Sequence, residues 1–82
     1  MRLPRDLSGH DLIRLLRRYG YEATRQAGSH IRLETKLRGY SHRVTIPDHD
    51  NLRVGTLNAI LSDVADYLKV DRSQLAKELF EK

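Results

Sequence analysis

The chain has 82 residues, a formal net charge of +4 and no cysteine. This length supports one domain, which we predict over 1–82. The lack of cysteine excludes disulfides, thiolate metal sites and thiol nucleophiles. The N-terminal residues lack the apolar core of a secretion signal, and no apolar run approaches the ~18 residues of a membrane span, so we expect a cytoplasmic protein with no membrane partner.

The positive charge is concentrated in the first part of the chain. Residues 1–46 hold ten Lys or Arg and four Asp or Glu, a balance of +6, whereas residues 47–82 hold five and seven, a balance of −2. Nine of the ten cations in the first part are arginine, whose planar guanidinium matches phosphate oxygens. The asymmetry favours contact with a nucleic acid, and the alternative is a solvated basic surface.

The first predicted element is an amphipathic helix over 8–19. Ser8 and Asp11 have the spacing of a capping box. Apolar residues then recur at helical spacing, at Leu12, Ile13, Leu15, Leu16 and Tyr19. Gly20 ends the helix.

Three strands are predicted next, over 21–26, 29–36 and 41–46. Side chains alternate between the two faces of a strand, so the middle strand has one apolar and one polar face. The apolar face carries Ile31, Leu33 and Thr35, and the polar face carries His30, Arg32 and Glu34. Glycines at the two connections indicate hairpins, so the sheet is expected to be antiparallel.

Two helices are predicted over 54–68 and 72–80. We expect Asp50 or Asn51 to cap the first, and residues 71–74 resemble a capping box for the second. The order of elements predicts an α+β fold in which a three-stranded antiparallel sheet carries helices on one face and exposes the other. The exposed face is expected to hold His30, Arg32, Glu34, Arg43 and Thr45.

Three motifs, in this order, resemble those of the HicA (YcfA-like) toxins, which are mRNA interferases of type II toxin–antitoxin systems. Residues 25–30 are similar to the R-x-x-G-S-H signature of that family. Residues 44–49 resemble its V-x-(V/I)-P-x-H step, and residues 52–61 resemble its L-x-x-G-T-L-x-x-I-L helix start. The resemblance covers about residues 7–80.

This resemblance implies a fold like that of a double-stranded-RNA-binding domain. It implies a toxin that cleaves RNA as an endoribonuclease, without a metal or another cofactor. It also implies a HicB-type antitoxin that covers the active site. The catalytic histidine of the family corresponds to His30.

The chemistry of RNA cleavage suits the predicted exposed face. RNA supplies its own nucleophile, the 2′-hydroxyl, so the protein must move protons and stabilise charge on the phosphate. An imidazole titrates near neutral pH, which makes His30 the predicted general acid or base. Arg32 and Arg43 are the predicted phosphate contacts, because a guanidinium stabilises developing negative charge.

Further residues complete the predicted site. Arg25 and Ser29 are assigned to RNA or phosphate binding, and Tyr40 to stacking on an unpaired base. Gly28 is expected to form the turn that positions His30. His49 is the candidate for a second acid or base.

Other interpretations of the same residues stay open at the level of sequence. His30 could be a surface histidine with no role. The chain could be a non-catalytic RNA-binding module, or an interaction module whose basic face docks an acidic partner. A metal site formed by His30, His42 and His49 has no supporting motif, so no metal is predicted.

Overall fold

The structure is a computed structural model that describes residues 3–81. The other three residues of the predicted domain, Met1, Arg2 and Lys82, lie outside the described residues. The elements are α1 (Gly9–Leu16), the 3-10 turn η1 (Arg17–Tyr19), β1 (Glu22–Ala27), β2 (His30–Thr35), β3 (His42–Pro47), α2 (Val54–Leu68) and α3 (Arg72–Phe80). The α+β order predicted from the sequence is confirmed.

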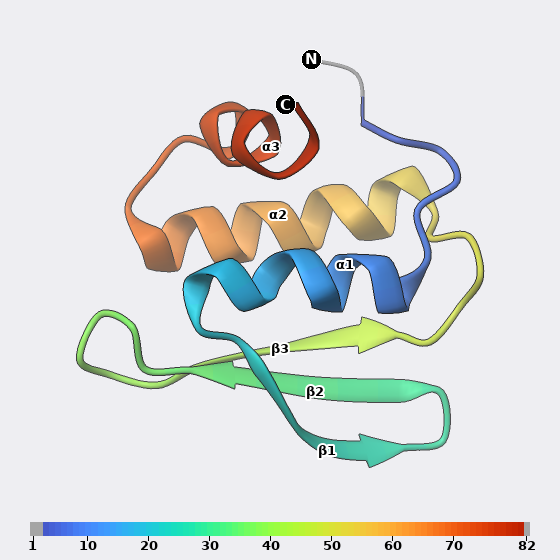
Figure 1. The fold of residues 1–82 in the computed structure, drawn as a ribbon, viewed down its shortest axis with the longest axis horizontal. Coiled ribbons are helices and arrows are strands. Elements are labelled where there is room, and N and C mark those ends of the chain that lie inside the picture. Colours follow the sequence, from blue (N-terminus) through green and yellow to red (C-terminus); the bar gives the residue numbers. More distant parts are fainter. Residues whose placement is uncertain (1–2, 82) are drawn as a thin grey trace.

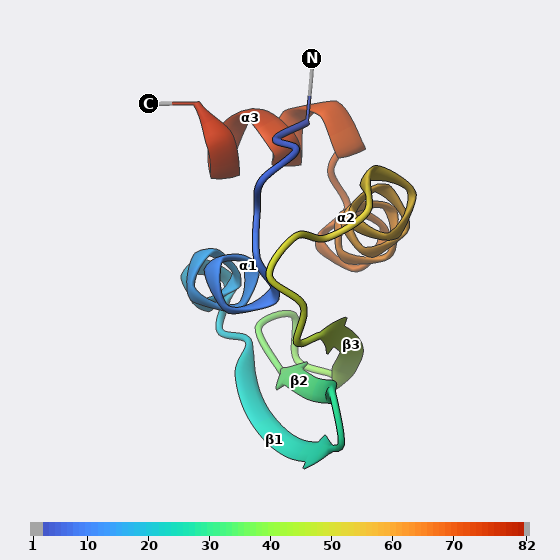
Figure 2. The same cartoon turned by 90° about the vertical axis from the view of Figure 1, so that its right-hand side faces the viewer.

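The elements form three layers (Figures 1 and 2). The sheet has the order β1-β2-β3, and both neighbouring pairs are antiparallel. The helices α1 and α2 lie side by side over one face of the sheet, and α3 lies across the far side of that pair. Within residues 3–81 no helix covers the other face of the sheet, and none is long and apolar enough to cross a membrane.

The hydrophobic core fills the space between the sheet and the two helices. The strands contribute Ile31, Leu33, Val44 and Ile46, and the helices contribute Leu12, Leu16, Leu57, Leu61 and Val64, all of them buried. Burying one aliphatic side chain of this size stabilises a fold by about 1.5–3 kcal/mol. The alternation in β2 and β3 and the helical spacing in α1 and α2 therefore direct side chains to one core.

The start of α1 is closed by the predicted capping box. The Ser8 hydroxyl accepts a hydrogen bond from the Asp11 N–H at 3.0 Å, and the Asp11 carboxylate accepts one from the Ser8 N–H at 3.2 Å. The Ser8 bonds lower the pKa of Asp11. Because the carboxylate stays ionised, its negative charge also interacts favourably with the positive N-terminal end of the helix dipole.

Neither α2 nor α3 has a side-chain capping bond. The cap predicted from Asp50 or Asn51 is wrong, because Arg53 occupies the position that precedes α2. The capping box predicted over 71–74 is also wrong, because its glutamine donates forward along α3 to Glu78 at 3.1 Å. Both helices are therefore stabilised mainly by packing.

The last helix is fastened to the turn that follows α1. The Tyr19 hydroxyl donates to the Glu78 carboxylate at 2.6 Å, and the Arg18 guanidinium donates to the Glu78 carbonyl. Burial and the neighbouring carboxylate raise the pKa of Tyr19 to about 12, so its hydroxyl stays protonated and remains a donor.

A polar network joins the start of β3 to α2. The His42 ring lies between Tyr21 and Asp63, with its Nδ1 2.7 Å from the Tyr21 hydroxyl and its Nε2 3.1 Å from the Asp63 carboxylate. The ring also stacks on Tyr67, with centroids 4.8 Å apart. Tyr21 is fully buried, so these contacts satisfy its hydroxyl within the core, and burial raises its pKa.

The loop between β2 and β3 is held by the same tyrosine of α2. The Tyr67 hydroxyl accepts from the Arg38 N–H at 2.8 Å and donates to the Tyr40 carbonyl at 2.7 Å. Gly39 has a φ of +88°, so this tight loop needs a residue without a Cβ. The loop is therefore pinned at the end of the strands opposite to His30.

Gly9 lies buried where α1 begins, against the end of β3. A Cβ at this position would lie 2.1 Å from the Pro47 carbonyl oxygen, and the Gly9 N–H donates to the His49 carbonyl at 2.9 Å. The backbones of α1 and of the segment after β3 are therefore in direct contact.

Replacing Gly9 with alanine is expected to destabilise the fold by about 1–3 kcal/mol, because the new methyl group meets backbone that cannot move freely. The matched control is Gly55→Ala, in the first turn of α2, where nothing lies within 4 Å of the added Cβ. This control should be neutral or up to about 1 kcal/mol more stable, because alanine favours the helix. Thermal unfolding followed by circular dichroism compares the two, and equal midpoints would contradict the close contact at Gly9.

Candidate functional site

His30 is the first residue of β2 and follows a tight hairpin turn. Ala27 pairs with His30, so Gly28 and Ser29 are the two central residues of the turn. Gly28 has a φ of +58°, which L side chains rarely adopt, as expected for the first central position of this kind of hairpin. Ser29 was expected to begin the strand, but it lies in the turn because the pair of Ala27 and His30 closes the hairpin.

The turn is tied to the segment that follows β3. The Ser29 carbonyl accepts a hydrogen bond from the Asp48 N–H at 2.6 Å. The Asp48 carboxylate is paired with His10 Nε2 of α1 at 2.8 Å, and His10 is exposed, as its place in the first helical turn indicated. The backbone at the start of β2 is therefore tied to the segment that follows β3.

A β-bulge at Thr24 changes which side of the sheet the next residue faces. The ladder pairs Ala23 with Leu33 and then Arg25 with Arg32, so Thr24 is an extra residue in β1. In a regular ladder Thr24 would lie opposite Arg32, and Arg25 would face the helices. The bulge instead places Arg25 on the exposed face.

One hollow of about 220 Å³ on the exposed face brings three of the predicted site residues together. Arg25, His30 and Arg32 line it, with Ala27 and Thr45. The first three side chains are all exposed. Within residues 3–81, no carboxylate forms an ion pair with either of these guanidinium groups.

The two arginines of the hollow face each other across the ladder. Like charges directly opposite each other in a sheet repel. An anion between Arg25 and Arg32 would relieve this repulsion, and a phosphate oxygen is the acceptor that two guanidinium groups suit best. The hollow therefore has the electrostatics of an anion site, with an imidazole at its edge.

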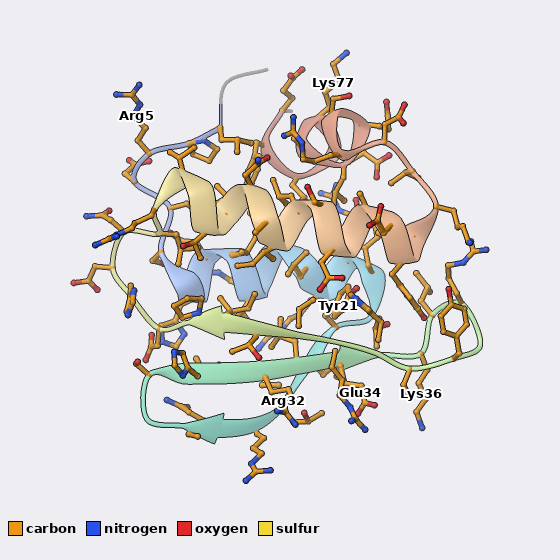
Figure 3. All side chains as sticks on the ribbon, turned by 180° about the vertical axis from the view of Figure 1, so that it is seen from behind. Arg5, Tyr21, Arg32, Glu34, Lys36 and Lys77 are labelled. Carbon is orange, nitrogen blue, oxygen red and sulfur yellow. The ribbon has the colours of Figure 1, made fainter. Side chains whose placement is uncertain are left out.

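The other end of the exposed face has mixed charge. Figure 3 shows the labelled side chains of Arg32 and Glu34 on β2, and of Lys36 just beyond its end, projecting away from the helices. Glu34 lies opposite Glu22 on β1, and on β3 it forms an ion pair with Arg43 at 3.3 Å. A hydrogen bond from Ser41 and the charge of Arg43 lower the pKa of Glu34, so it stays ionised.

Besides Gly28 and Ser29 of the turn, three other predicted site residues do not line the hollow. Arg43 is engaged by the carboxylate of Glu34. Tyr40 is exposed in the loop at the far end of the strands, with its ring edge-on to Tyr67 at a centroid distance of 5.0 Å. His49 is exposed in the segment after β3, two residues beyond the end of that strand.

The three histidines considered for a metal site are not gathered. His30 pairs with Pro47 and His42 pairs with Thr35, which places the two histidines at opposite ends of the ladder between β2 and β3. They also face opposite sides of the sheet. In the described part of the chain, no three metal-ligating side chains come together.

Residues 9–65, more than half of the chain, match the family model described as "HicA toxin of bacterial toxin-antitoxin". The chain belongs to the HicA toxin family. It is therefore a toxin of a toxin–antitoxin pair, and membership implies an antitoxin partner. Searches of curated proteins and of solved structures found no match.

The part of the chain that matches the HicA family contains every residue that lines the hollow, and it ends within α2. The helix α3 lies beyond the match. The candidate site of this HicA-family toxin is therefore built from the shared part, while α3 closes the core from behind.

Pyrophosphate is expected to bind in this hollow, because one anion can contact both guanidinium groups, which have no ion-pair partner in the described part of the chain. Arg25→Ala and Arg32→Ala should each weaken binding about fivefold, since such an exposed contact contributes up to about 1 kcal/mol. NMR titration of the backbone amides would measure the affinity and locate the site at His30 and Arg32.

Arg43→Ala is the matched control, because it removes the same charge from the same face. Arg43 is already occupied by Glu34, so its loss should weaken pyrophosphate binding less than about twofold. An equal loss from all three variants would show that net charge, rather than the hollow, governs binding.

Proposed function

We propose that this chain is an endoribonuclease that cleaves mRNA, with His30 as a general acid or base. The supporting observation is an exposed imidazole that lines the same hollow as two arginines, neither of which forms an ion pair within residues 3–81. The resemblance of residues 25–30 to the family signature supports the same residue. A cytoplasmic location is proposed with this activity, because the substrate is mRNA.

The proposed reaction is an internal transfer within RNA. The 2′-oxygen attacks the adjacent phosphorus, and the bond from phosphorus to the 5′-oxygen of the next nucleotide breaks. One group takes the proton of the 2′-hydroxyl, and one gives a proton to the departing 5′-oxygen. Arg25 and Arg32 stabilise the additional negative charge on the phosphate oxygens during this exchange. Because these two guanidinium groups neutralise that negative charge, the proposal needs no metal or other cofactor.

His49 is the proposed partner for the second proton step. It follows Asp48, whose N–H binds the carbonyl of Ser29, the residue before His30. The two histidines therefore belong to backbone segments that meet at one end of the sheet. Gly28 and Ser29 are proposed to fix the direction of the His30 ring through this turn.

The remaining predicted contacts are proposed to bind RNA away from the cleaved bond. Tyr40 lies beyond the far end of β2, and five residues of strand span roughly 17 Å. A base stacked on Tyr40 would therefore belong to a nucleotide several positions from the one held at His30. Arg43 lies between these ends and would contact phosphate only in exchange for Glu34.

The proposed antitoxin is of the HicB type and covers the hollow. Carboxylates of the antitoxin would take the place of phosphate between Arg25 and Arg32. Complementary charge of this kind speeds association and selects the partner. Occupation of the hollow would exclude RNA without any change in the fold.

Replacing His30 with alanine is expected to lower RNA cleavage by about 10²–10⁴-fold and to abolish growth inhibition, because the proton-transfer group is lost. The side chain is exposed, so the unfolding midpoint should not change. Cleavage of a structured RNA by purified protein is the measurement.

His10→Ala is the control for that experiment, since it removes another exposed histidine that does not line the hollow. It should keep most of the activity. His30→Ala protein that cleaves at the wild-type rate would defeat the proposed role. RNA binding without scission by the wild-type chain would instead support a non-catalytic RNA-binding module.

Cleavage is expected to persist in excess EDTA, because the charge on the reacting phosphate is neutralised by guanidinium groups. RNA affinity should fall steeply with added salt, and each phosphate-contacting arginine that is removed should reduce the salt slope by about one unit. Complete loss of cleavage in EDTA, restored by a divalent cation, would contradict the proposed mechanism.

A further inference from the structure

β1 is an edge strand, and it is unusually exposed. All six of its residues are exposed, whereas β3, the other edge strand, buries Val44 and Ile46. Figure 2 shows β1 curving below the sheet centre, away from the layer formed by α1 and α2. Its principal contact is with β2. One side of this strand is therefore open to another chain.

The open edge presents backbone hydrogen-bonding groups. In a two-residue hairpin the closing pair, Ala27 and His30, exchanges hydrogen bonds, and the next pair, Gln26 and Ile31, does not. The N–H and C=O of Gln26 therefore point away from β2. Among the described residues, no backbone bond from outside the sheet reaches residues 22–27.

This edge carries little of the protection that edge strands usually have. Proline and lysine commonly block pairing at such edges, and β1 contains neither. β3 ends in Pro47. The bulge at Thr24 interrupts only the first half of β1 and leaves residues 25–27 in regular register with β2.

We propose that the antitoxin adds an extended strand to the free edge of β1 along residues 25–27, and this inference rests on the antitoxin pairing of the proposed function. Alternate side chains of an added strand face the same side as Arg25. Carboxylates at those positions would lie beside the hollow and contact Arg25 and Arg32. The backbone hydrogen bonds would hold the antitoxin strand on β1, and its carboxylates would keep RNA out of the hollow.

Charge selects an acidic protein strand over the other occupants of this edge. A second copy of the chain would bring its own Arg25 toward this one, and the chain carries a net charge of +4. An RNA strand has no alternating N–H and C=O groups with which to continue the ladder. An acidic strand would continue the backbone ladder and would also neutralise Arg25 and Arg32, which have no ion pair among residues 3–81.

The test compares Gln26→Pro with Gln26→Ala. Proline removes the N–H that faces the open edge, and the ladder to β2 keeps its bonds because Gln26 is not bonded in it. Both variants lose the side-chain bond from Gln26 to the Gly28 carbonyl, so the alanine variant controls for that loss. The binding partner is the cognate antitoxin, with affinity measured by calorimetry.

Gln26→Pro is expected to weaken antitoxin binding about tenfold or more, while Gln26→Ala stays within about threefold of the wild type. RNA cleavage should survive in both variants, because Gln26 does not line the hollow. Wild-type affinity in a folded Gln26→Pro variant would overturn the proposal.

Amide hydrogen exchange on His30→Ala protein, whose β1 has the natural sequence, gives a second measurement. This measurement does not require the proline variant to fold. The Gln26 amide should exchange quickly in the free chain and become protected in the complex. Unchanged exchange at Gln26 in a saturated complex would overturn the proposal. A wild-type chain that dimerises on its own, and a Gln26→Pro variant that does not, would also overturn it, because a second copy would then occupy the edge. The exchange experiment uses His30→Ala protein, so its outcome is independent of whether the chain cleaves RNA.

Discussion

The candidate site depends on the unrelieved repulsion between two guanidinium groups. Arg25 and Arg32 are direct neighbours across the ladder, and no carboxylate of the described chain neutralises them. Such a pair costs stability in the free protein, and it is tolerated because water screens it on an uncovered face. The same arrangement makes this the point on the sheet where a bound anion gains most, so repulsion in the free state becomes affinity in the bound state.

The two faces of the sheet divide the work of the molecule. One face carries the core together with α1 and α2, and α3 supports that pair through the bonds of Arg18 and Tyr19 to Glu78. The other face contributes almost nothing to the core. Its side chains are therefore not required to be apolar, and they can be charged groups that bind a ligand. In β1 the side chains on both faces are exposed, and one edge of the strand is unpaired within the sheet.

The sequence predicted the parts of this structure that repeat regularly. The strict alternation of β2 and β3 placed His30, Arg32, Glu34 and Arg43 on the exposed face, because both strands are paired without interruption. The bulge at Thr24 could not be predicted, since β1 alternates weakly and no glycine or proline marks the extra residue. Arg25 was therefore found through its place in a family motif, and its geometry came only from the structure. The ion pair between Arg43 and Glu34 forms because these residues lie opposite each other on β3 and β2. The pattern within one strand does not reveal which residues of two strands lie opposite each other.

The polarity of the exposed face limits how an acidic strand and an RNA can each use it. The hollow lies at the end near the Gly28 turn, and the opposite end holds Glu22 and Glu34, which lie across from each other. A phosphate is therefore drawn most strongly to the hollow, and RNA that continues toward Tyr40 must pass the end of mixed charge, where Arg43 is paired with Glu34. On the proposed function, a strand added along β1 meets the same two arginines from the side. RNA and antitoxin then compete for the same charges, and neutralisation of the toxin requires no movement of its fold.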